Sequence, residues 1–335
     1  MMSRLFEQGA PVELDGLTDA WLLDGKGGGE RLGGAQVANC EPMDGQWLWM
    51  HLDYSRPAVQ AWMYRYSQLH ELTVEALLQA ETRPRCVVAD NGLLIFLRGV
   101  NLNPGADPED MVSLRIWMGE GRIYTLGLRH LLSLDDLREL MARGTGPEGQ
   151  GDFLVMLVNL LLDRVGRVID DLYDRVDELE ESVLTVSGHE QRGELASIRR
   201  QAITLRRFLA PQREALNRLA AERSALFSNE HHLYLREASD RLTRFVEDLD
   251  AARERAGVVH ESLVSNLTEQ TNNRMYILSV IAAVFLPLSF VTGLLGINVG
   301  GIPGAESSLG FFLVVLGMLL LAVGLLGFFR WRRWF

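Results

Sequence analysis

The stretch Phe285-Leu-Pro-Leu-Ser-Phe-Val-Thr-Gly-Leu-Leu-Gly-Ile-Asn-Val-Gly-Gly-Ile-Pro-Gly304 ends one uncharged segment and leads through a glycine-rich loop into another. No Asp, Glu, Lys or Arg occurs from Met275 to Ala305, and none occurs from Ser307 to Phe329. Because a helix needs about 20 apolar residues to cross the hydrocarbon core of a bilayer, each segment is long enough to span a membrane. Two helices cannot enclose a pathway, so any pore requires several copies of the chain.

The same stretch carries a family resemblance. Gly296-Ile297-Asn298, which follows Pro287-Leu-Ser-Phe290, resembles the Gly-Met-Asn signature of the CorA superfamily of divalent-cation channels and transporters. Ile in place of Met is similar to the ZntB branch, the bacterial zinc transporters. Further segments resemble that branch, so the resemblance covers most of the chain: Gly300-Gly-Ile-Pro-Gly304, Glu81-Thr-Arg-Pro-Arg85, Gly144-Thr-Gly-Pro147 and Ala210-Pro-Gln-Arg213.

The resemblance implies a CorA-like funnel, in which an α/β cytoplasmic domain and a long α-helical stalk precede two C-terminal transmembrane helices. It further implies a homopentamer in the bacterial inner membrane that transports zinc or another divalent cation as its substrate. The expected domains follow the composition of the chain: 1–150 cytoplasmic α/β, 151–273 helical domain and stalk, 274–296 first transmembrane helix, 297–308 periplasmic loop, 309–330 second transmembrane helix and 331–335 cytoplasmic tail.

Charge and composition exclude several functions. The 335 residues include 33 Lys plus Arg against 44 Asp plus Glu, and the resulting net charge of -11 argues against a nucleic-acid partner. We find no nucleophile–base pair, cofactor loop or metalloprotease motif, and therefore expect neither enzymatic activity nor a resident cofactor. Cys40 and Cys86 do not form a Cys-x-x-Cys motif, and we interpret them as reduced structural thiols.

The charges that flank the apolar segments predict the topology. Arg274 precedes the first segment, and Arg330, Arg332 and Arg333 follow the second, whereas the connecting loop has Glu306 as its only charge. By the positive-inside rule, both termini lie in the cytoplasm and the loop lies outside. Glu306 is either a solvated carboxylate or a group that recruits cations.

The first ~145 residues read as a mixture of strands and helices. The composition of 20–24 and 46–52 is typical of β-strands. Hairpins are expected at 86–98 and 112–126, where Asp90-Asn-Gly92 and Gly119-Glu-Gly121 provide the turns. Helices are expected at 57–67, 73–81 and 133–143, with Pro57 at a first helical position and Ser133 as a cap. Gly27-Gly-Gly29 reads as a turn, because no Gly-Lys-Ser/Thr follows it.

From Phe153 onward the chain is predicted to be helical, with helices at 153–186 and 190–227 and a kink or helix start at Pro211. The third helix carries a heptad seam, formed by Ala238, Leu242, Phe245, Leu249, Ala252, Ala256, Val259, Leu263 and Asn266. It continues into the first apolar segment, which predicts a stalk of about 100 Å at 1.5 Å rise per residue. The seam either packs within one subunit or surrounds a symmetry axis.

One face of the first apolar segment is predicted to line a pore. Its members lie three or four residues apart and therefore on one side of a helix: Met275, Leu278, Ala282, Leu286, Ser289, Gly293 and Gly296. Rings of the apolar members would dewet and block ions. The resemblance places a selectivity filter at Gly296, Ile297 and Asn298, where the Asn amide would hold a hydrated cation.

The identity of the metal does not follow from the residues. No His lies in either apolar segment, and there is no His-x-x-x-His motif. His260-Glu261, next to the membrane, is either a surface pair or a sensor of metal or pH. The acidic helix around Asp170 is either a solvated face or a cation-binding surface. Three functions remain: a zinc transporter driven by the membrane potential and stimulated by protons, a channel for Mg²⁺, Co²⁺ or Ni²⁺, or a membrane-anchored coiled-coil scaffold or sensor that conducts nothing.

Overall fold

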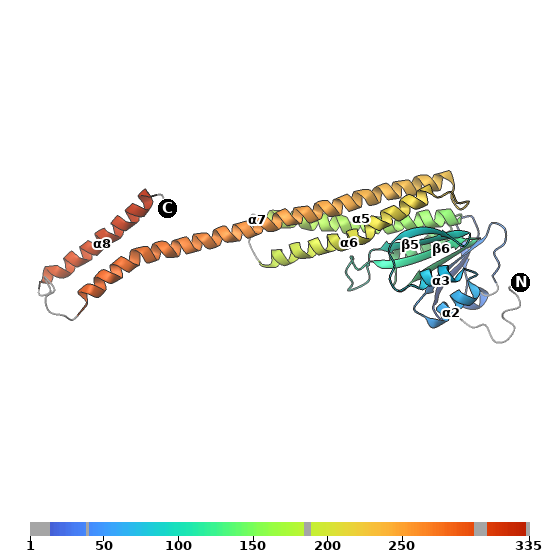
Figure 1. The fold of residues 1–335 in the computed structure, drawn as a ribbon, viewed down its shortest axis with the longest axis horizontal. Coiled ribbons are helices and arrows are strands. Elements are labelled where there is room, and N and C mark those ends of the chain that lie inside the picture. Colours follow the sequence, from blue (N-terminus) through green and yellow to red (C-terminus); the bar gives the residue numbers. More distant parts are fainter. Residues whose placement is uncertain (1–13, 38–39, 184–188, 298–306, 333–335) are drawn as a thin grey trace. The chain divides into compact units, whose positions relative to one another are not determined.

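The computed structural model describes residues 14–37, 40–183, 189–297 and 307–332. These residues belong to two compact units, Met1–His260 and Glu261–Phe335. Helix α7 (Asn229–Leu295) contributes to both units (Figure 1). The second unit begins before Arg274, where we expected the first transmembrane helix to start.

The first unit contains a seven-stranded sheet in the order β2-β1-β3-β7-β6-β5-β4. Only the central pair β3–β7 is parallel; the other neighbours are antiparallel. The strands are β1 Leu17–Leu23, β2 Gly29–Arg31, β3 Trp47–Asp53, β4 Arg85–Ala89, β5 Gly92–Gly99, β6 Val112–Gly119 and β7 Arg122–Gly127. Short helices accompany them: α1 Gly34–Val37, α2 Pro57–Tyr66, α3 Glu71–Leu78 and α4 Leu132–Ala142.

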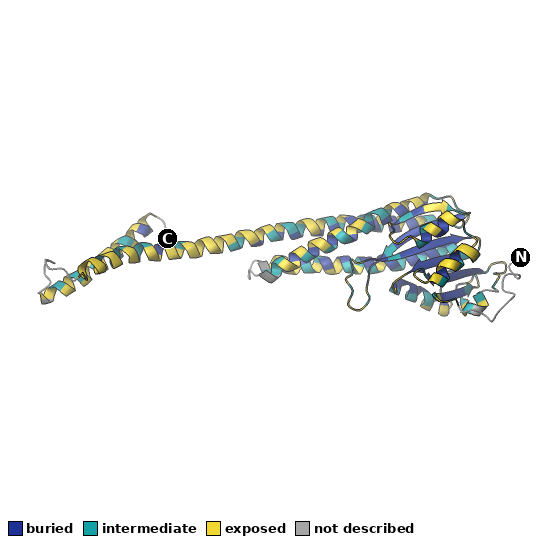
Figure 2. Ribbon diagram, turned by 60° about the horizontal axis from the view of Figure 1, so that its bottom comes forward, coloured by how far each residue is buried: buried dark blue, intermediate teal, exposed yellow. Residues whose placement is uncertain are grey.

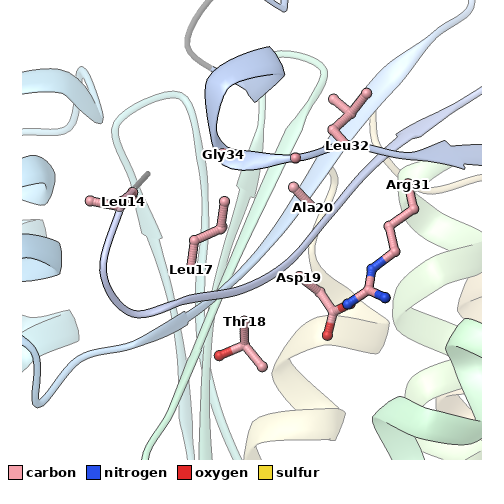
Figure 3. A pocket seen from close by; sticks show the side chains of 9 residues that line it. Leu14, Leu17, Thr18, Asp19, Ala20, Arg31, Leu32 and Gly34 are labelled. Carbon is pink, nitrogen blue, oxygen red and sulfur yellow. The ribbon is translucent and has the colours of Figure 1, made fainter. Parts of the chain in front are cut away.

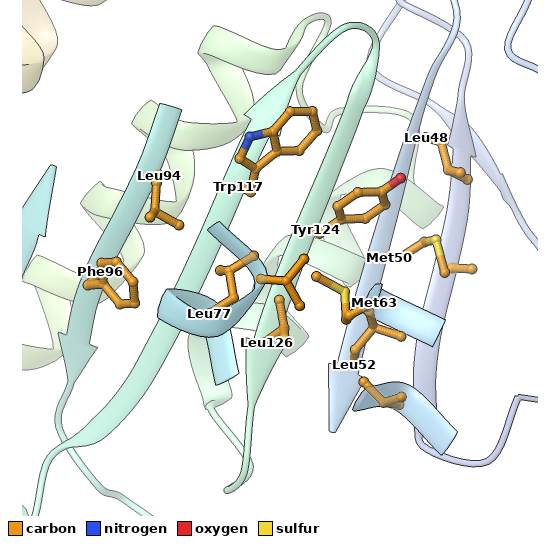
Figure 4. Packing of buried hydrophobic residues seen from close by; sticks show 13 residues of the cluster. Leu48, Met50, Leu52, Met63, Leu77, Leu94, Phe96, Trp117, Tyr124 and Leu126 are labelled. Atoms are coloured by element: carbon orange, nitrogen blue, oxygen red, sulfur yellow. The ribbon is translucent and has the colours of Figure 1, made fainter. Parts of the chain in front are cut away.

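Both faces of this sheet are covered, which explains why its central strands are apolar at successive positions. Because alternate side chains of a strand point to opposite faces, Leu48 and Met50 pack with Met63 and Leu77 of α2 and α3 (Figure 4). On the other face, the Trp49 ring lies 5.4 Å from the ring of Phe153. Phe153 belongs to α5 (Gln150–Val183), so the helical part of the unit shares a core with the sheet.

The sequence predicted most of these elements. Both hairpins are confirmed, and Asp90, Asn91 and Glu120 take the positive φ angles that their turns require. Pro57 occupies the first turn of α2 as expected. The prediction that Ser133 caps helix α4 was wrong. Leu131 precedes α4 without a capping side chain, and the buried Ser133 hydroxyl donates instead to the Leu160 carbonyl of α5. The sequence also missed β2 and α1.

Helices α5, α6 (His189–Ala221) and the first part of α7 pack together. Polar contacts between α5 and α7 join residues 75 to 79 positions apart, so these two helices run parallel in a constant register. They are His231–Asp152, Arg241–Asp163, Tyr173–Asp248 and Arg255 with Asp177 and Glu180. Helix α6 continues through Pro211, which therefore does not start a helix.

The heptad seam of α7 packs within this single chain. Leu242, Leu249, Ala252 and Ala256 are at most 1% exposed, and Ala238 and Val259 are also buried. A side chain that is buried inside its own unit has no surface left for a symmetry axis. Of the two interpretations, core packing within the subunit is therefore correct for the buried part of the seam.

The second unit contains the end of α7 and helix α8 (Ser308–Trp331). Both helices are long and apolar enough to cross a membrane. Partly covered or buried residues recur every three or four positions on each helix and therefore share one side of it: Tyr276, Val280, Val284, Pro287 and Val291 on α7, and Val314, Met318, Ala322, Leu325 and Phe329 on α8. Most of the remaining residues of these helices are exposed (yellow in Figure 2). Many of them are large apolar side chains.

Candidate ion pathway along helix α7

The predicted pore-lining stripe is uncovered along its whole length. All seven residues, Met275, Leu278, Ala282, Leu286, Ser289, Gly293 and Gly296, are exposed. They lie on a different side of α7 from the covered positions Tyr276 to Val291, and Leu286 is 73% exposed. The chain therefore leaves this stripe free for lipid, for another copy or for an aqueous pathway.

Helix α7 ends where the signature begins. Its last residue is Leu295, and the Gly296 amide donates to the Thr292 carbonyl at 2.9 Å, which closes the final turn. A Cβ at Gly296 would lie 3.0 Å from that carbonyl oxygen, so glycine permits the close approach. Ile297 follows as an exposed bend. The predicted filter residue Asn298 and the loop residue Glu306 lie outside the described residues.

Some hydroxyl groups in the apolar part of α7 form hydrogen bonds to backbone carbonyls of their own helix, and others do not. The Ser279 hydroxyl donates to the Met275 carbonyl at 2.8 Å, and the Thr292 hydroxyl donates to the Leu288 and Ser289 carbonyls. The Ser289 hydroxyl has no hydrogen bond to any residue in the described part of the chain. Ser289 therefore presents an unused oxygen on the uncovered stripe.

The other candidate metal-binding groups are not gathered into a site. Within the described residues, no group of three or more His, Cys, Asp and Glu side chains could hold a metal ion together. His260 is half-buried and Glu261 is exposed. In the acidic helix α5, Asp163 bonds to Arg241 at 2.7 Å and Asp177 to Arg255 at 2.5 Å. Part of that acidic face thus pairs with arginines of α7.

A cavity of about 410 Å³ lies in the α/β domain, at the sheet edge formed by β1 and β2 (Figure 3). Its lining includes the buried carboxylate of Asp19. That carboxylate lies 2.9 Å from the Arg31 guanidinium and 2.8 Å from Arg138. Because two positive charges face one negative charge, this cavity does not suit a cation.

Comparisons with known proteins identify the family. A family model described as CorA-like Mg²⁺ transporter protein matches residues 44–332. The chain is 41% identical over 318 residues to the divalent cation transporter CmaX of Pseudomonas aeruginosa, covering 94% of each chain. It is 35% identical over 326 residues to the zinc transport protein ZntB of Yersinia enterocolitica, covering 97% of this chain and 98% of that relative.

Solved structures agree with this result. The structure of full-length CmaX matches 97% of this chain and 100% of its own with a TM-score of 0.84 at 41% identity. The CorA magnesium transporter from Methanocaldococcus jannaschii matches 93% of this chain and 97% of its own with a TM-score of 0.78. At 17% identity, that second likeness shows the fold alone.

The chain therefore belongs to the CorA family of divalent-cation transporters. The resemblance first indicated by Gly296-Ile297-Asn298 is confirmed. The expected fold class, an α/β domain, a long helix and two C-terminal apolar helices, is confirmed as well. The spacing in the sequence predicted the uncovered stripe, but it did not identify the covered stripe on the opposite side of α7. That stripe has the same three-and-four spacing, so periodicity alone could not separate the two.

Proposed function

We propose that this chain assembles as a homopentamer in the bacterial inner membrane and imports zinc ions along a pore lined by α7. The observation that carries the proposal is the uncovered stripe from Met275 to Gly296, which leads directly into the signature. A stripe of apolar and small residues that includes an unsatisfied hydroxyl is more useful around an aqueous axis than toward lipid. Both termini lie in the cytoplasm in this proposal, and transport involves no enzymatic step or resident cofactor.

The residues have distinct proposed roles along the pathway. Rings of Met275, Leu278 and Leu286 form apolar constrictions that gate ions by dewetting. The Ser289 hydroxyl supplies oxygen to a passing ion or its water shell. At the outer mouth, Asn298 receives the hydrated cation, with backbone carbonyls from Gly296 and Ile297.

The end of α7 supports the location of the entrance. The last carbonyls of a helix lack intrahelical partners and carry a partial negative charge of about half an elementary charge. In α7 this end lies at Leu295, immediately before the filter. Several such helix ends around one axis would attract cations without any carboxylate in the pore.

Zinc is proposed as the substrate because relatives named zinc transport protein ZntB match nearly the whole chain. The description of the family model as a Mg²⁺ transporter favours magnesium as the second candidate. Uptake of Zn²⁺ and of Mg²⁺ into liposomes that contain purified protein would separate the two. Zinc uptake should depend on Asn298, whereas Asn273→Ala, which removes an exposed amide near the cytoplasmic end of the span, should leave uptake unchanged. Uptake of Mg²⁺ but not Zn²⁺ would contradict the proposed substrate.

The inward-negative potential favours import, since a divalent ion gains about 4.6 kcal/mol per 100 mV. We further propose that an inward proton gradient stimulates zinc uptake. Neither apolar segment contains Asp, Glu or His, so the titrating groups would lie outside them, with His260 and Glu261 as candidates. The test is zinc uptake at fixed membrane potential while only the pH difference changes. A rate that does not respond would identify a passive channel.

A further inference from the structure

Helix α6 exposes a basic face formed by three arginines. Arg200, Arg207 and Arg218 are exposed, and Ile203 lies between the first two with 52% of its surface accessible. None of the three guanidinium groups forms a salt bridge with a described residue, although Arg207 lies 4.7 Å from the Phe208 ring. Their spacings of 7 and 11 residues correspond to about two and three turns of 3.6 residues, so the arginines share one side of α6.

Helix α7 exposes an acidic face over a similar length. Asp240, Glu247 and Glu254 recur every 7 residues, are all exposed, and form no salt bridge within the described residues. Neighbouring acids of the same helix behave differently, because Glu237 bonds to Arg244 and Asp250 bonds to Arg206. The three exposed carboxylates therefore have no salt-bridge partner in the part of the chain that the structure describes.

The two faces also lie at the same heights along the helices. The 2.8 Å contact between Arg206 and Asp250 fixes the register of α6 against α7. Ser239 of α7 donates to Asn217 of α6 at 2.7 Å, so the two contacts show that these helices run in opposite directions. Each step along α6 therefore corresponds to one step back along α7. On this register Arg207 is level with position 249, Arg200 with 256 and Arg218 with 238. Each exposed arginine thus lies within two residues, about 3 Å at 1.5 Å per residue, of the level of one exposed acid.

We infer that these faces are the two halves of an interface between copies of this chain. Arg207 of one copy lies opposite Glu247 of the next, Arg200 opposite Glu254, and Arg218 opposite Asp240. Rotation about an axis parallel to the helices leaves the position of each residue along that axis unchanged. Every copy can therefore form the same three pairs with its neighbour. Two different faces in contact form a head-to-tail interface, which can close into a ring. The inference rests on the proposed function only in requiring a cyclic assembly.

Charge reversal tests the pairing in the full-length protein in detergent. Exposed ion pairs are individually weak, so two reversed pairs should weaken association on the order of thirty-fold at about 50 mM salt, with a smaller effect near 1 M salt. Arg200→Glu with Arg207→Glu should show this loss, as should Glu247→Arg with Glu254→Arg. All four substitutions in one chain should restore association. The matched control reverses Asp170 and Asp174, exposed acids of α5, and should not rescue the arginine variant.

Native mass spectra over a dilution series, with circular dichroism to verify folding, separate the possible failures. An oligomeric wild type whose reversal variants associate as tightly as before would overturn the interface but not the proposed pore. Loss of association without rescue in the fourfold variant would mean that the faces bind something else, and would also overturn it. A monomeric wild type would contradict both the interface and the proposed assembly.

Cross-linking tests the relative positions of the paired residues along the helices, independently of the strength of association. Arg207→Cys combined with Glu247→Cys should give a ladder of linked chains on mild oxidation. Arg207→Cys with Glu237→Cys, which displaces one partner by ten residues or about 15 Å, should not. Equal cross-linking by both pairs would overturn the proposed register.

Discussion

Replacing Thr125 by Val should lower the free energy of unfolding of the α/β domain, because one hydroxyl takes part in several buried hydrogen bonds. The Thr125 hydroxyl is fully buried between β3 and β7, where it accepts from Trp49 Nε1 at 2.8 Å and donates to the Met50 carbonyl at 3.2 Å. It also bonds to His51 Nδ1 at 3.0 Å. One buried hydroxyl therefore serves two aromatic ring nitrogens and a backbone carbonyl.

Valine keeps the shape and the β-branch but removes the acceptor. Two buried ring nitrogens, Trp49 Nε1 and His51 Nδ1, then lose this hydrogen-bond partner, and each unsatisfied group costs about 1–3 kcal/mol. Allowing for partial relaxation, we expect a loss of about 3 kcal/mol in the free energy of unfolding. For a domain of this size that corresponds to a fall in Tm of about 6–12 °C.

Tryptophan fluorescence of the detergent-solubilised protein during heating measures this change. The chain has 7 Trp, of which Trp21, Trp47, Trp49, Trp62 and Trp117 lie in the α/β domain. Thr145→Val is the control, because its exposed hydroxyl makes only a 3.3 Å bond to the Leu140 carbonyl. If Thr125→Val lowers Tm no more than Thr145→Val does, the buried network does not stabilise the domain.

Three further outcomes are expected. Burial lowers the pKa of His51 to about 4, so the folded protein keeps its full stability above pH 6.5 and loses up to about 3 kcal/mol of it as the pH drops toward 4. His51→Gln should flatten that part of a Tm–pH profile, and an unchanged slope would show that His51 does not cause the pH dependence. Asn298→Ala should greatly reduce divalent-cation uptake while assembly remains intact, and normal flux would remove the filter role. Ser289→Ala should slow uptake more than Ser279→Ala, whose hydroxyl is already bonded to its own helix; equal rates would show that Ser289 does not meet the ion.

Patterns in the sequence were sufficient to predict the elements that depend mainly on local sequence. An uncharged run of membrane length has few alternatives to a transmembrane helix, and Asp90-Asn-Gly92 encodes its hairpin through local backbone preferences. The spacing from Met275 to Gly296 likewise located a stripe that the structure leaves uncovered. The signature at Gly296-Ile297-Asn298 identified the family, because it is a local feature of one loop.

Tertiary packing decided which partner each face meets. The heptad seam of α7 was compatible with a subunit core or a symmetry axis, and only the packed chain shows Leu242, Leu249 and Ala256 buried in their own bundle. Ser133 satisfies the capping pattern, but α5 lies close enough to receive its hydroxyl at Leu160. Periodicity specifies which side chains share a face, whereas the partner of that face depends on elements distant in sequence. For that reason the sequence alone determined a membrane-anchored helical protein of this family, and the tertiary structure determined which side of α7 remains open.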